Sequence, residues 1–363
     1  MRILTKTLLL FLLVFACQPK AEQTDAKYED AIFKARAIMA EVMEENETPG
    51  MAVAVSVKGE LVWSEGFGFS DVENQKKVDP AVTLFRIGSV SKTLTASAIA
   101  LLIEEGKLDV DQPVQTYVPG FPEKKYPITV KQTGGHIAGI RHYRGREMWS
   151  DVYYPTVNEG LEIFKDDSLL FEPGTDYSYS SYGWNLISAV IEGASGEEFL
   201  TYMQRRVFNP LEMKNTKADI ASDEMENRTK FYVRSDTGVV VAPYVDNSYK
   251  WAGGGFIASA EDLIIFGHSH VRSGFLKQES LDAVQKPQTL NNGESTNYGM
   301  GWRSGEDDEK FYVGHSGGSV GGITQFKIYP EEEVIVALVS NCSPISYKGA
   351  ESRIARLFME SSN

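Results

Sequence analysis

Cysteine and histidine are both scarce in this sequence. Its 363 residues include two cysteines, Cys17 and Cys342, and five histidines. Because Cys17 stands at the end of an apolar N-terminal run, no disulfide framework is expected. Cys342 closely follows a strand-like stretch at residues 334–340, so we expect it to be a small buried side chain.

Runs of basic residues are also absent. The formal net charge at pH 7 is −14, and an acidic surface argues against a nucleic-acid partner. Beyond the first segment, no apolar run approaches the length that spans a bilayer. The roughly 340 residues that remain are enough for one large domain or two interleaved ones.

The N-terminus has the pattern of an export signal. A basic start followed by the apolar run 8–15 predicts a signal peptide over residues 1–16, too short to span a bilayer. Residues 14–17 resemble a bacterial lipobox, which would leave Cys17 as a lipid-modified first residue, followed by a polar tether over residues 17–27. We therefore expect a lipoprotein of the periplasm or outer membrane; the alternative is ordinary cleavage and a soluble secreted protein.

Strand patterns lie at both ends of the chain and helical patterns dominate the middle. Strands are expected at residues 51–57, 60–64, 311–313, 323–329 and 334–340. Helices are expected at residues 30–45, 184–192, 198–206 and 347–359. This order predicts an α+β fold in which both chain ends build one antiparallel sheet with flanking helices. We place the sheet domain at residues 28–88 and 245–363, and an inserted, mostly helical domain at residues 89–244.

The segment Ser89-Val90-Ser91-Lys92 lies between a strand-like run and an apolar helical run. Positions i and i+3 of a helix are neighbours, so Lys92 can reach the hydroxyl oxygen of Ser89. Backbone amides at a first helical turn have no helical partner and favour a developing oxyanion. Burial lowers the pKa of a lysine, which can then accept the serine proton. Taken alone, the pattern also describes a serine that caps an ordinary helix.

Tyr179 is a second candidate, in the turn at residues 173–181 that leads into a helix. Its phenol can relay a proton, or accept one if the Lys92 ammonium favours the phenolate. The alternative is a tyrosine that packs its ring and bonds its hydroxyl to the backbone.

A glycine-rich segment at residues 314–322 directly follows the strand pattern at 311–313. Residues without side chains let a substrate backbone approach closely, as an added strand. The amides of Gly318 and Ser89 can then supply two oxyanion donors. A glycine-rich hairpin without a function is the alternative.

Three motifs, Ser89-Val90-Ser91-Lys92, Tyr179-Ser180-Ser181 and His315-Ser316-Gly317, occur in a characteristic order and spacing. The chain thereby resembles the serine β-lactamase and penicillin-binding protein family, in its class C-like branch. Residues 139–143 and 245–255 are similar to one sub-branch, the mitochondrial β-lactamase-like serine protease and its bacterial relatives. The similarity extends over nearly the whole mature chain.

The resemblance implies a β-lactamase/transpeptidase-like fold and an acyl-enzyme on Ser89. It implies that Lys92 and Tyr179 transfer protons, that the amides of Ser89 and Gly318 form the oxyanion hole, and that no metal or cofactor takes part. The substrate would be a peptide, an ester or a small cell-wall-type molecule. The eukaryotic relative assembles into filaments, so an oligomer is compatible with the resemblance.

Two substrate-binding positions depart from the β-lactamase pattern. The middle motif usually ends in Asn, whose amide holds the substrate amide, but here it ends in Ser181. The third motif usually starts with Lys, but here it starts with His315, followed by Ser316 and Gly317 as further substrate-binding residues. Because His315 is mostly neutral at pH 7, the fixed charge for a substrate carboxylate is missing. Both changes favour a peptidase or esterase over a β-lactamase or D-alanyl-D-alanine carboxypeptidase.

Other interpretations of these residues compete with this one. Residues 314–318 also spell the nucleophile elbow of α/β-hydrolases, but a strand pattern follows and no histidine occurs after His315. His268 and His270 suggest a metal pair, but they lie in a helical pattern on which positions two apart diverge, so a solvated helix face is expected. A non-catalytic, lipid-anchored binding or scaffold protein stays an alternative. Residues 142–171 form part of the cleft wall or a surface insertion.

Overall fold

The computed structural model describes residues 26–271 and 274–362. The signal peptide expected at residues 1–16, the lipidation site Cys17 and most of the tether lie outside the described residues. Within those two ranges, no helix is long and apolar enough to cross a membrane.

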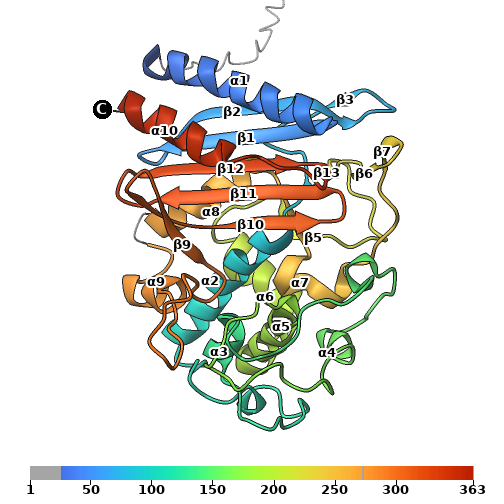
Figure 1. The fold of residues 1–363 in the computed structure, drawn as a ribbon, viewed down its shortest axis with the longest axis vertical. Helices are drawn as coiled ribbons and strands as arrows, with labels where there is room; N and C mark the ends of the chain where they lie inside the picture. Colours follow the sequence, from blue (N-terminus) through green and yellow to red (C-terminus); the bar gives the residue numbers. More distant parts are fainter. Residues whose placement is uncertain (1–25, 272–273, 363) are drawn as a thin grey trace, which may run out of the picture.

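The centre of the fold is a seven-stranded sheet with the order β3-β2-β1-β12-β11-β10-β9, and every pairing in it is antiparallel (Figure 1). β1 pairs with β12 from Met51 opposite Ser340 to Val57 opposite Val334, so the two ends of the chain meet in mid-sheet. The α+β fold with one sheet built from both chain ends is confirmed. The strands are β1 (Gly50–Val57), β2 (Glu60–Asp71), β3 (Lys76–Lys77), β9 (Arg303–Asp307), β10 (Lys310–Ser319), β11 (Gly322–Tyr329) and β12 (Val334–Ser340).

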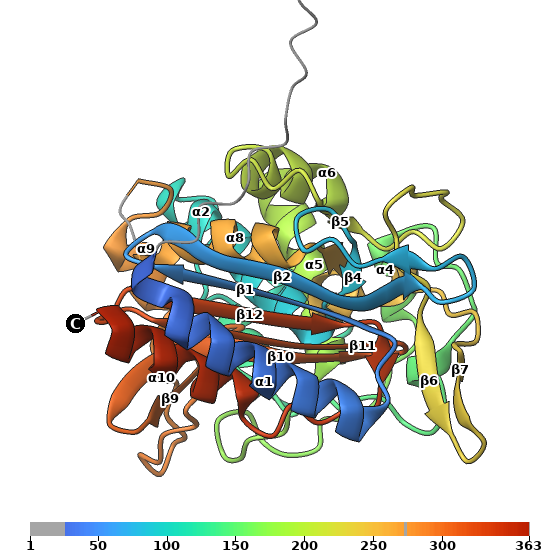
Figure 2. The ribbon, with the colours of Figure 1, turned by 90° about the horizontal axis from the view of Figure 1, so that it is seen from above.

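Helices cover both faces of this sheet (Figure 2). On one face, α1 (Glu29–Asn46) and α10 (Ala350–Ser362) pack on alternate side chains of β1, among them Met51 and Val53. On the other face, α2 (Ser91–Glu104) and α8 (Ala260–Val271) share a core with Ala52 and Ala54. Because successive side chains of a strand point to opposite faces and both faces are buried, β1 and β12 are apolar except for Ser56 and Ser340.

The middle of the chain surrounds α5 (Ser181–Ser195), whose Trp184, Leu186 and Ile187 are fully buried. Long irregular segments connect the shorter helices of this region. These helices are α3 (Val130–Gly134), α4 (Val157–Leu161), α6 (Phe199–Met203), α7 (Trp251–Gly254) and α9 (Gln278–Gln285).

Two small sheets link the middle of the chain to its ends. One contains β4 (Phe85–Arg86), β8 (Phe256–Ala258) and β5 (Thr216–Ala218); the other contains β13 (Cys342–Ser343), β6 (Tyr232–Ser235) and β7 (Gly238–Val241). The strand patterns of β5, β6 and β7 were not recognised in the sequence. Cys342 is fully buried, as expected.

The expectation for the two histidines of α8 was wrong. The segment is a helix, but His270 is buried and its Nδ1 lies 3.0 Å from the carbonyl oxygen of Phe266. His268 is half-buried and its Nε2 lies 2.6 Å from the hydroxyl of Ser56 in β1. Because α8 packs on the sheet, this side of the helix faces protein rather than solvent.

Candidate active site

Ser89 is held where β4 turns into α2. It lies in the short 3₁₀-helix η2 (Gly88–Val90), so the α-helix begins two residues later than the sequence pattern suggested. Gly88 has φ +50°, and a Cβ atom there would lie 2.6 Å from the amide nitrogen of Gly318. Glycine therefore lets η2 approach β10 closely and brings Ser89 beside the glycine-rich strand.

Lys92 is fully buried and reaches three partners. Its Nζ lies 3.0 Å from Oγ of Ser89, 3.3 Å from Oγ of Ser181 and 2.5 Å from the carbonyl oxygen of Gly253. No carboxylate of the described residues forms an ion pair with it. Burial, with further contributions from the charges of Arg303 and Lys250, holds its pKa well below the usual value of a lysine.

These contacts fit a neutral amine. Two N–H bonds of Lys92 can point to the carbonyl of Gly253 and the hydroxyl of Ser181, which leaves the nitrogen lone pair for the hydroxyl hydrogen of Ser89. The geometry thus provides a base at hydrogen-bond distance from a nucleophile.

Tyr179 is half-buried, and its hydroxyl is shielded from water without a well-aligned hydrogen bond to the described residues. Burial raises the pKa of this phenol, and the Ser89 hydroxyl and the Arg303 guanidinium oppose the shift without reversing it. Nζ of Lys92 lies 5.0 Å from the ring centroid. These surroundings disfavour the phenolate, so they favour the protonated form of Tyr179, which can donate or relay a proton.

Two histidines hold the turn that carries Tyr179. Nδ1 of His136 accepts the amide hydrogen of Ser180 at 3.1 Å, and Nδ1 of His142 accepts that of Ser181 at 3.0 Å. An acceptor nitrogen must be unprotonated. Burial lowers the pKa of His142 to about 4 and that of His136 well below its usual value, so both rings stay neutral.

His315 is also neutral, because burial and the nearby Lys92 lower its pKa. Its Nδ1 lies 2.5 Å from the carbonyl oxygen of Ser316, and its Nε2 lies 2.9 Å from the hydroxyl of Tyr298. The ring donates through Nδ1 and accepts through Nε2, which leaves no nitrogen for a substrate. The neutral state agrees with the sequence analysis, whereas direct substrate binding by this ring does not fit the contacts.

β10 offers an open edge beside Ser89. β9 pairs only with Lys310–Gly314, and the ladder to β11 continues to Ser319 opposite Gly322. Because hydrogen-bonded pairs alternate along an antiparallel ladder and this last pair closes the hairpin, the backbone groups of Gly318 and Ser316 point away from β11.

The same strand explains the glycines. A Cβ atom at Gly317 would lie 1.9 Å from the carbonyl oxygen of Ile87, whereas Ser316 and Gly318 are exposed. The chain runs as a strand from Lys310 through the whole motif and turns back into β11. A nucleophile elbow requires a helix at this point, so that alternative is excluded.

Arg303 was missed by the sequence analysis. It opens β9 opposite Gly314, and its exposed guanidinium carbon lies 5.6 Å from the ring centroid of Tyr179 and 5.5 Å from that of Tyr298. A single arginine at the start of a short edge strand carries no sequence signal of its own. Its guanidinium provides a fixed positive charge beside the motif His315-Ser316-Gly317, which the neutral ring of His315 does not provide.

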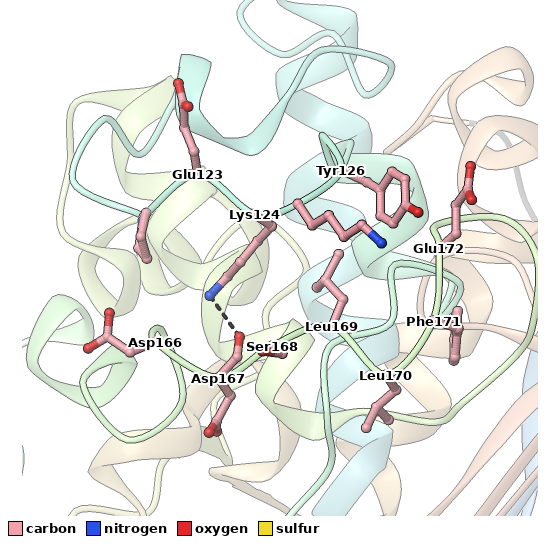
Figure 3. A pocket seen from close by; sticks show the side chains of 12 residues that line it. Glu123, Lys124, Tyr126, Asp166, Asp167, Ser168, Leu169, Leu170, Phe171 and Glu172 are labelled. Atoms are coloured by element: carbon pink, nitrogen blue, oxygen red, sulfur yellow. Dashed lines mark hydrogen bonds between the residues drawn. The ribbon is translucent and has the colours of Figure 1, made fainter.

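The segment at residues 142–171 contacts the site through His142 at its start. His142 binds the amide of Ser181, while Asp166 to Phe171 line a surface cavity of about 550 Å³ together with residues 122–126 (Figure 3). Lys124 donates to the carbonyl of Asp167 across this cavity at 2.9 Å. None of Ser89, Lys92 and Tyr179 lines it, so this cavity is separate from the candidate active site.

The fold and the motifs define a serine hydrolase of the β-lactamase type, and comparison with known proteins agrees. The beta-lactamase family model matches residues 35–357, and the chain belongs to this family, whose members are serine hydrolases. The chain is 31% identical over 437 residues to the mitochondrial serine beta-lactamase-like protein LACTB of Homo sapiens, covering 90% of this chain and 80% of that protein.

Bacterial and archaeal proteins are similar as well. Penicillin-binding protein 4* of Bacillus subtilis is 28% identical over 306 residues, which cover 78% of this chain and 66% of that one. The octameric penicillin-binding protein homologue from Pyrococcus abyssi superposes with a TM-score of 0.79 at 26% identity, covering 91% of this chain and 77% of that one.

The burial of Lys92 predicts a pH-dependent cost in stability. A lysine whose pKa is lowered on folding binds more protons in the unfolded chain, so this group favours folding progressively more as pH rises toward its ordinary value of 10.5. For Lys92→Met, the free energy of unfolding relative to the wild type should be most favourable near pH 5 and decline toward pH 9, as measured by urea denaturation. Lys107→Met, which removes an exposed lysine, should give a flat difference; a flat difference for Lys92→Met would show that Lys92 stays charged.

Proposed function

We propose that this enzyme forms an acyl-enzyme on Ser89 and hydrolyses peptide or ester bonds. The observation that carries the proposal is the buried amine of Lys92, 3.0 Å from Oγ of Ser89 and without an ion-pair partner among the described residues. A lysine in this setting serves no evident structural purpose, because burying an amine is unfavourable unless its chemistry is used.

The proposed reaction begins when Lys92 accepts the proton of Ser89 and Oγ attacks the substrate carbonyl carbon. The amides of Ser89 and Gly318 stabilise the negative charge that develops on the carbonyl oxygen. The tetrahedral intermediate then collapses, the bond to the leaving group breaks, and Tyr179 donates its proton to the departing nitrogen or oxygen. The proton on Lys92 restores the Tyr179 phenol, and water hydrolyses the acyl-enzyme by the same groups in reverse.

The residues around the nucleophile favour peptides or esters over β-lactams. The side chain of Ser181 is short, and its hydroxyl oxygen lies 3.3 Å from Nζ of Lys92. It therefore does not reproduce the amide contact of the asparagine that is usual at this position. The open edge of β10 at Ser316 and Gly318 suits an extended backbone that adds as a strand. A non-catalytic binding or scaffold role would leave the arrangement of Ser89, Lys92 and Tyr179 without a purpose.

The first test compares two serines of one motif. Ser89→Ala should abolish labelling by a fluorophosphonate probe and cleavage of a diverse peptide mixture read by mass spectrometry. Ser91→Ala should retain both, because the Ser91 hydroxyl accepts from the amide of Phe256 and, among the described residues, contacts neither Ser89 nor Lys92. Labelling that survives Ser89→Ala would refute the nucleophile, and a wild-type protein that is neither labelled nor active would favour the binding role.

A second test addresses Tyr179 as the acid for the leaving group. Tyr179→Phe should reduce cleavage of an anilide about 10²- to 10⁴-fold, the usual contribution of a general acid. Hydrolysis of the 4-nitrophenyl ester of the same acyl group should fall far less, because nitrophenolate leaves without a proton. Equal losses for the two substrates would contradict this role.

Arg303 supports a second candidate, a carboxypeptidase of the D-alanyl-D-alanine type. Its exposed guanidinium lies beside the proton donor for the leaving group, where the terminal carboxylate of a peptide would lie. If this is the function, Arg303→Met should raise KM about tenfold or more for a peptide with a free C-terminus and leave its C-terminal amide almost unaffected. The same change for both peptides would exclude carboxylate recognition by Arg303.

Export and anchoring through Cys17 are further proposals, supported by the pattern of residues 1–27 alone. A soluble secreted form is the alternative. An oligomer is proposed on similarity only, since the homologue from Pyrococcus abyssi is octameric.

A further inference from the structure

His136 holds the turn before α5 on both sides of Tyr179. It follows α3 by two residues and is 2% exposed. Its carbonyl oxygen accepts the amide hydrogen of Ser178 at 3.0 Å, and its Nδ1 accepts that of Ser180 at 3.1 Å. Since Tyr179 stands between these two residues, one histidine fixes its backbone from both directions.

The ring of His136 also contacts the ring of Tyr179. The two ring centroids lie 4.2 Å apart, and the ring of Tyr298 lies 4.5 Å from that of His136. The hydroxyl of Tyr298 bonds to Nε2 of His315 in β10 at 2.9 Å. Packed rings therefore connect Tyr179 to the strand beside Ser89, and they resist a displacement of its ring.

The phenol end of Tyr179 is not anchored in this way. Its hydroxyl has no well-aligned hydrogen bond to the described residues. The direction of the phenol is therefore set by the turn and by the ring contacts. His142 adds a ring contact at 5.6 Å, but its Nδ1 holds the amide of Ser181, further along the turn.

The position of His136 is locally unfavourable in two respects. Its φ is +66°, in the left-handed region that residues other than glycine rarely adopt. Because Nδ1 accepts a hydrogen bond, Nε2 carries the ring hydrogen, and this buried donor has no partner within residues 26–271 and 274–362. A buried donor without an acceptor is destabilising. A conformation that is kept despite both effects points to a function.

The proton transfer proposed for Tyr179 depends on accurate placement. An amide nitrogen leaves only when it receives a proton, so an acid that is displaced from the leaving group slows amide cleavage. A nitrophenolate leaves without a proton, so the same displacement hardly affects its ester. The placement of Tyr179 therefore bears on amides more than on activated esters.

We propose that His136 is a positioning residue for Tyr179, which acts by accepting the Ser180 amide hydrogen and thereby sets how well the enzyme cleaves amides relative to activated esters. The proposal deepens, and rests on, the proposed acyl transfer at Ser89 with Tyr179 as the acid. It assigns no contact with the substrate to His136 itself.

Two variants separate the acceptor from the backbone conformation. Glycine and asparagine both adopt positive φ readily, so neither His136→Gly nor His136→Asn strains the chain. The asparagine oxygen is bonded to Cγ, as Nδ1 is, and it can accept the amide hydrogen of Ser180, whereas glycine has no acceptor. His136→Gly should lower the ratio of kcat/KM for the anilide to that for the 4-nitrophenyl ester about 10- to 100-fold, the usual effect of a small misplacement. His136→Asn should retain most of the wild-type ratio.

A double-mutant cycle tests whether His136 acts through Tyr179. A ratio measured on one preparation does not depend on the fraction of protein that is folded. In the Tyr179→Phe background, His136→Gly should leave the ratio unchanged, because the group that it positions is gone. A further loss as large as in the wild type would overturn the proposal, and so would equal losses for His136→Gly and His136→Asn.

His270→Asn is the matched control. His270 is a buried histidine whose ring contacts Phe266 and Trp302, outside the turn that carries Tyr179. The variant should lower the melting temperature and leave the ratio unchanged. A lowered ratio here would show that the loss of any buried histidine has this effect, which contradicts a positioning role.

Hydrogen exchange of the Ser180 amide, followed by NMR, tests the contact without turnover. Exchange should be slow in the wild type and in His136→Asn, and faster in His136→Gly. Equal exchange in all three proteins would refute the contact, whether or not Tyr179 proves to be the acid. An unchanged ratio for Tyr179→Phe would remove the proposed acid, whereas a loss for Tyr179→Phe with none for His136→Gly would overturn this inference alone.

Discussion

The arrangement of this site depends on the hydrogen bonds of the buried Lys92 amine. Its three partners, Ser89, Ser181 and Gly253, come from η2, α5 and α7, which are far apart in the sequence. Each of these elements must be placed accurately, because a buried amine that loses one hydrogen-bond partner also loses the compensation for its burial. The packing of α2 against α5 and α7 is therefore as much a part of the chemistry as the side chains themselves.

The charges around this amine share one sign. Arg303 and Lys250 both disfavour a proton on Lys92, and no carboxylate of the described residues pairs with it. The same positive surroundings, together with burial, keep His136 and His315 neutral, and this lets each ring accept a hydrogen bond. Burial and the positive charges thus favour the neutral amine of Lys92. They also favour the neutral rings of His136 and His315, whose hydrogen bonds hold the turn before α5 and the strand β10. The cost is that Lys92 is buried without an ion-pair partner among the described residues, a loss of stability in exchange for reactivity.

Elements that depend on local residue patterns, such as apolar runs and helical spacing, could be predicted from the sequence. The apolar runs of β1 and β12 predicted central strands. The i, i+3 spacing correctly predicted that the amine of Lys92 lies at hydrogen-bond distance from the Ser89 hydroxyl. β10 was predicted too short, since glycine weakens a strand pattern, and the reason for its glycines is a close approach to η2 that only the fold reveals. α8 was recognised as a helix, but periodicity does not tell which neighbour covers His270.

The residues that sequence reasoning missed share a feature. Arg303 and His136 lie in short or irregular segments, where no periodicity marks a side chain as buried or convergent. Their importance arises from contacts across the fold: Arg303 reaches Tyr179 from the edge strand, and His136 reaches Ser180 from the loop after α3. Spatial convergence of this kind cannot be derived from a single sequence, because it depends on how the middle of the chain packs against the sheet.

Recognition along the open edge of β10 needs a second contribution. Backbone pairing at Ser316 and Gly318 is indifferent to side chains, so it would align many extended substrates without choosing among them. Selection must then come from groups beyond the edge. Arg303 is such a group, because its exposed guanidinium lies beside the ring of Tyr179, at the end of the edge where the proposed leaving group departs. A substrate that places a carboxylate there would gain binding energy that a neutral substrate of the same length lacks, so the charge at this end of the edge can discriminate where the backbone cannot.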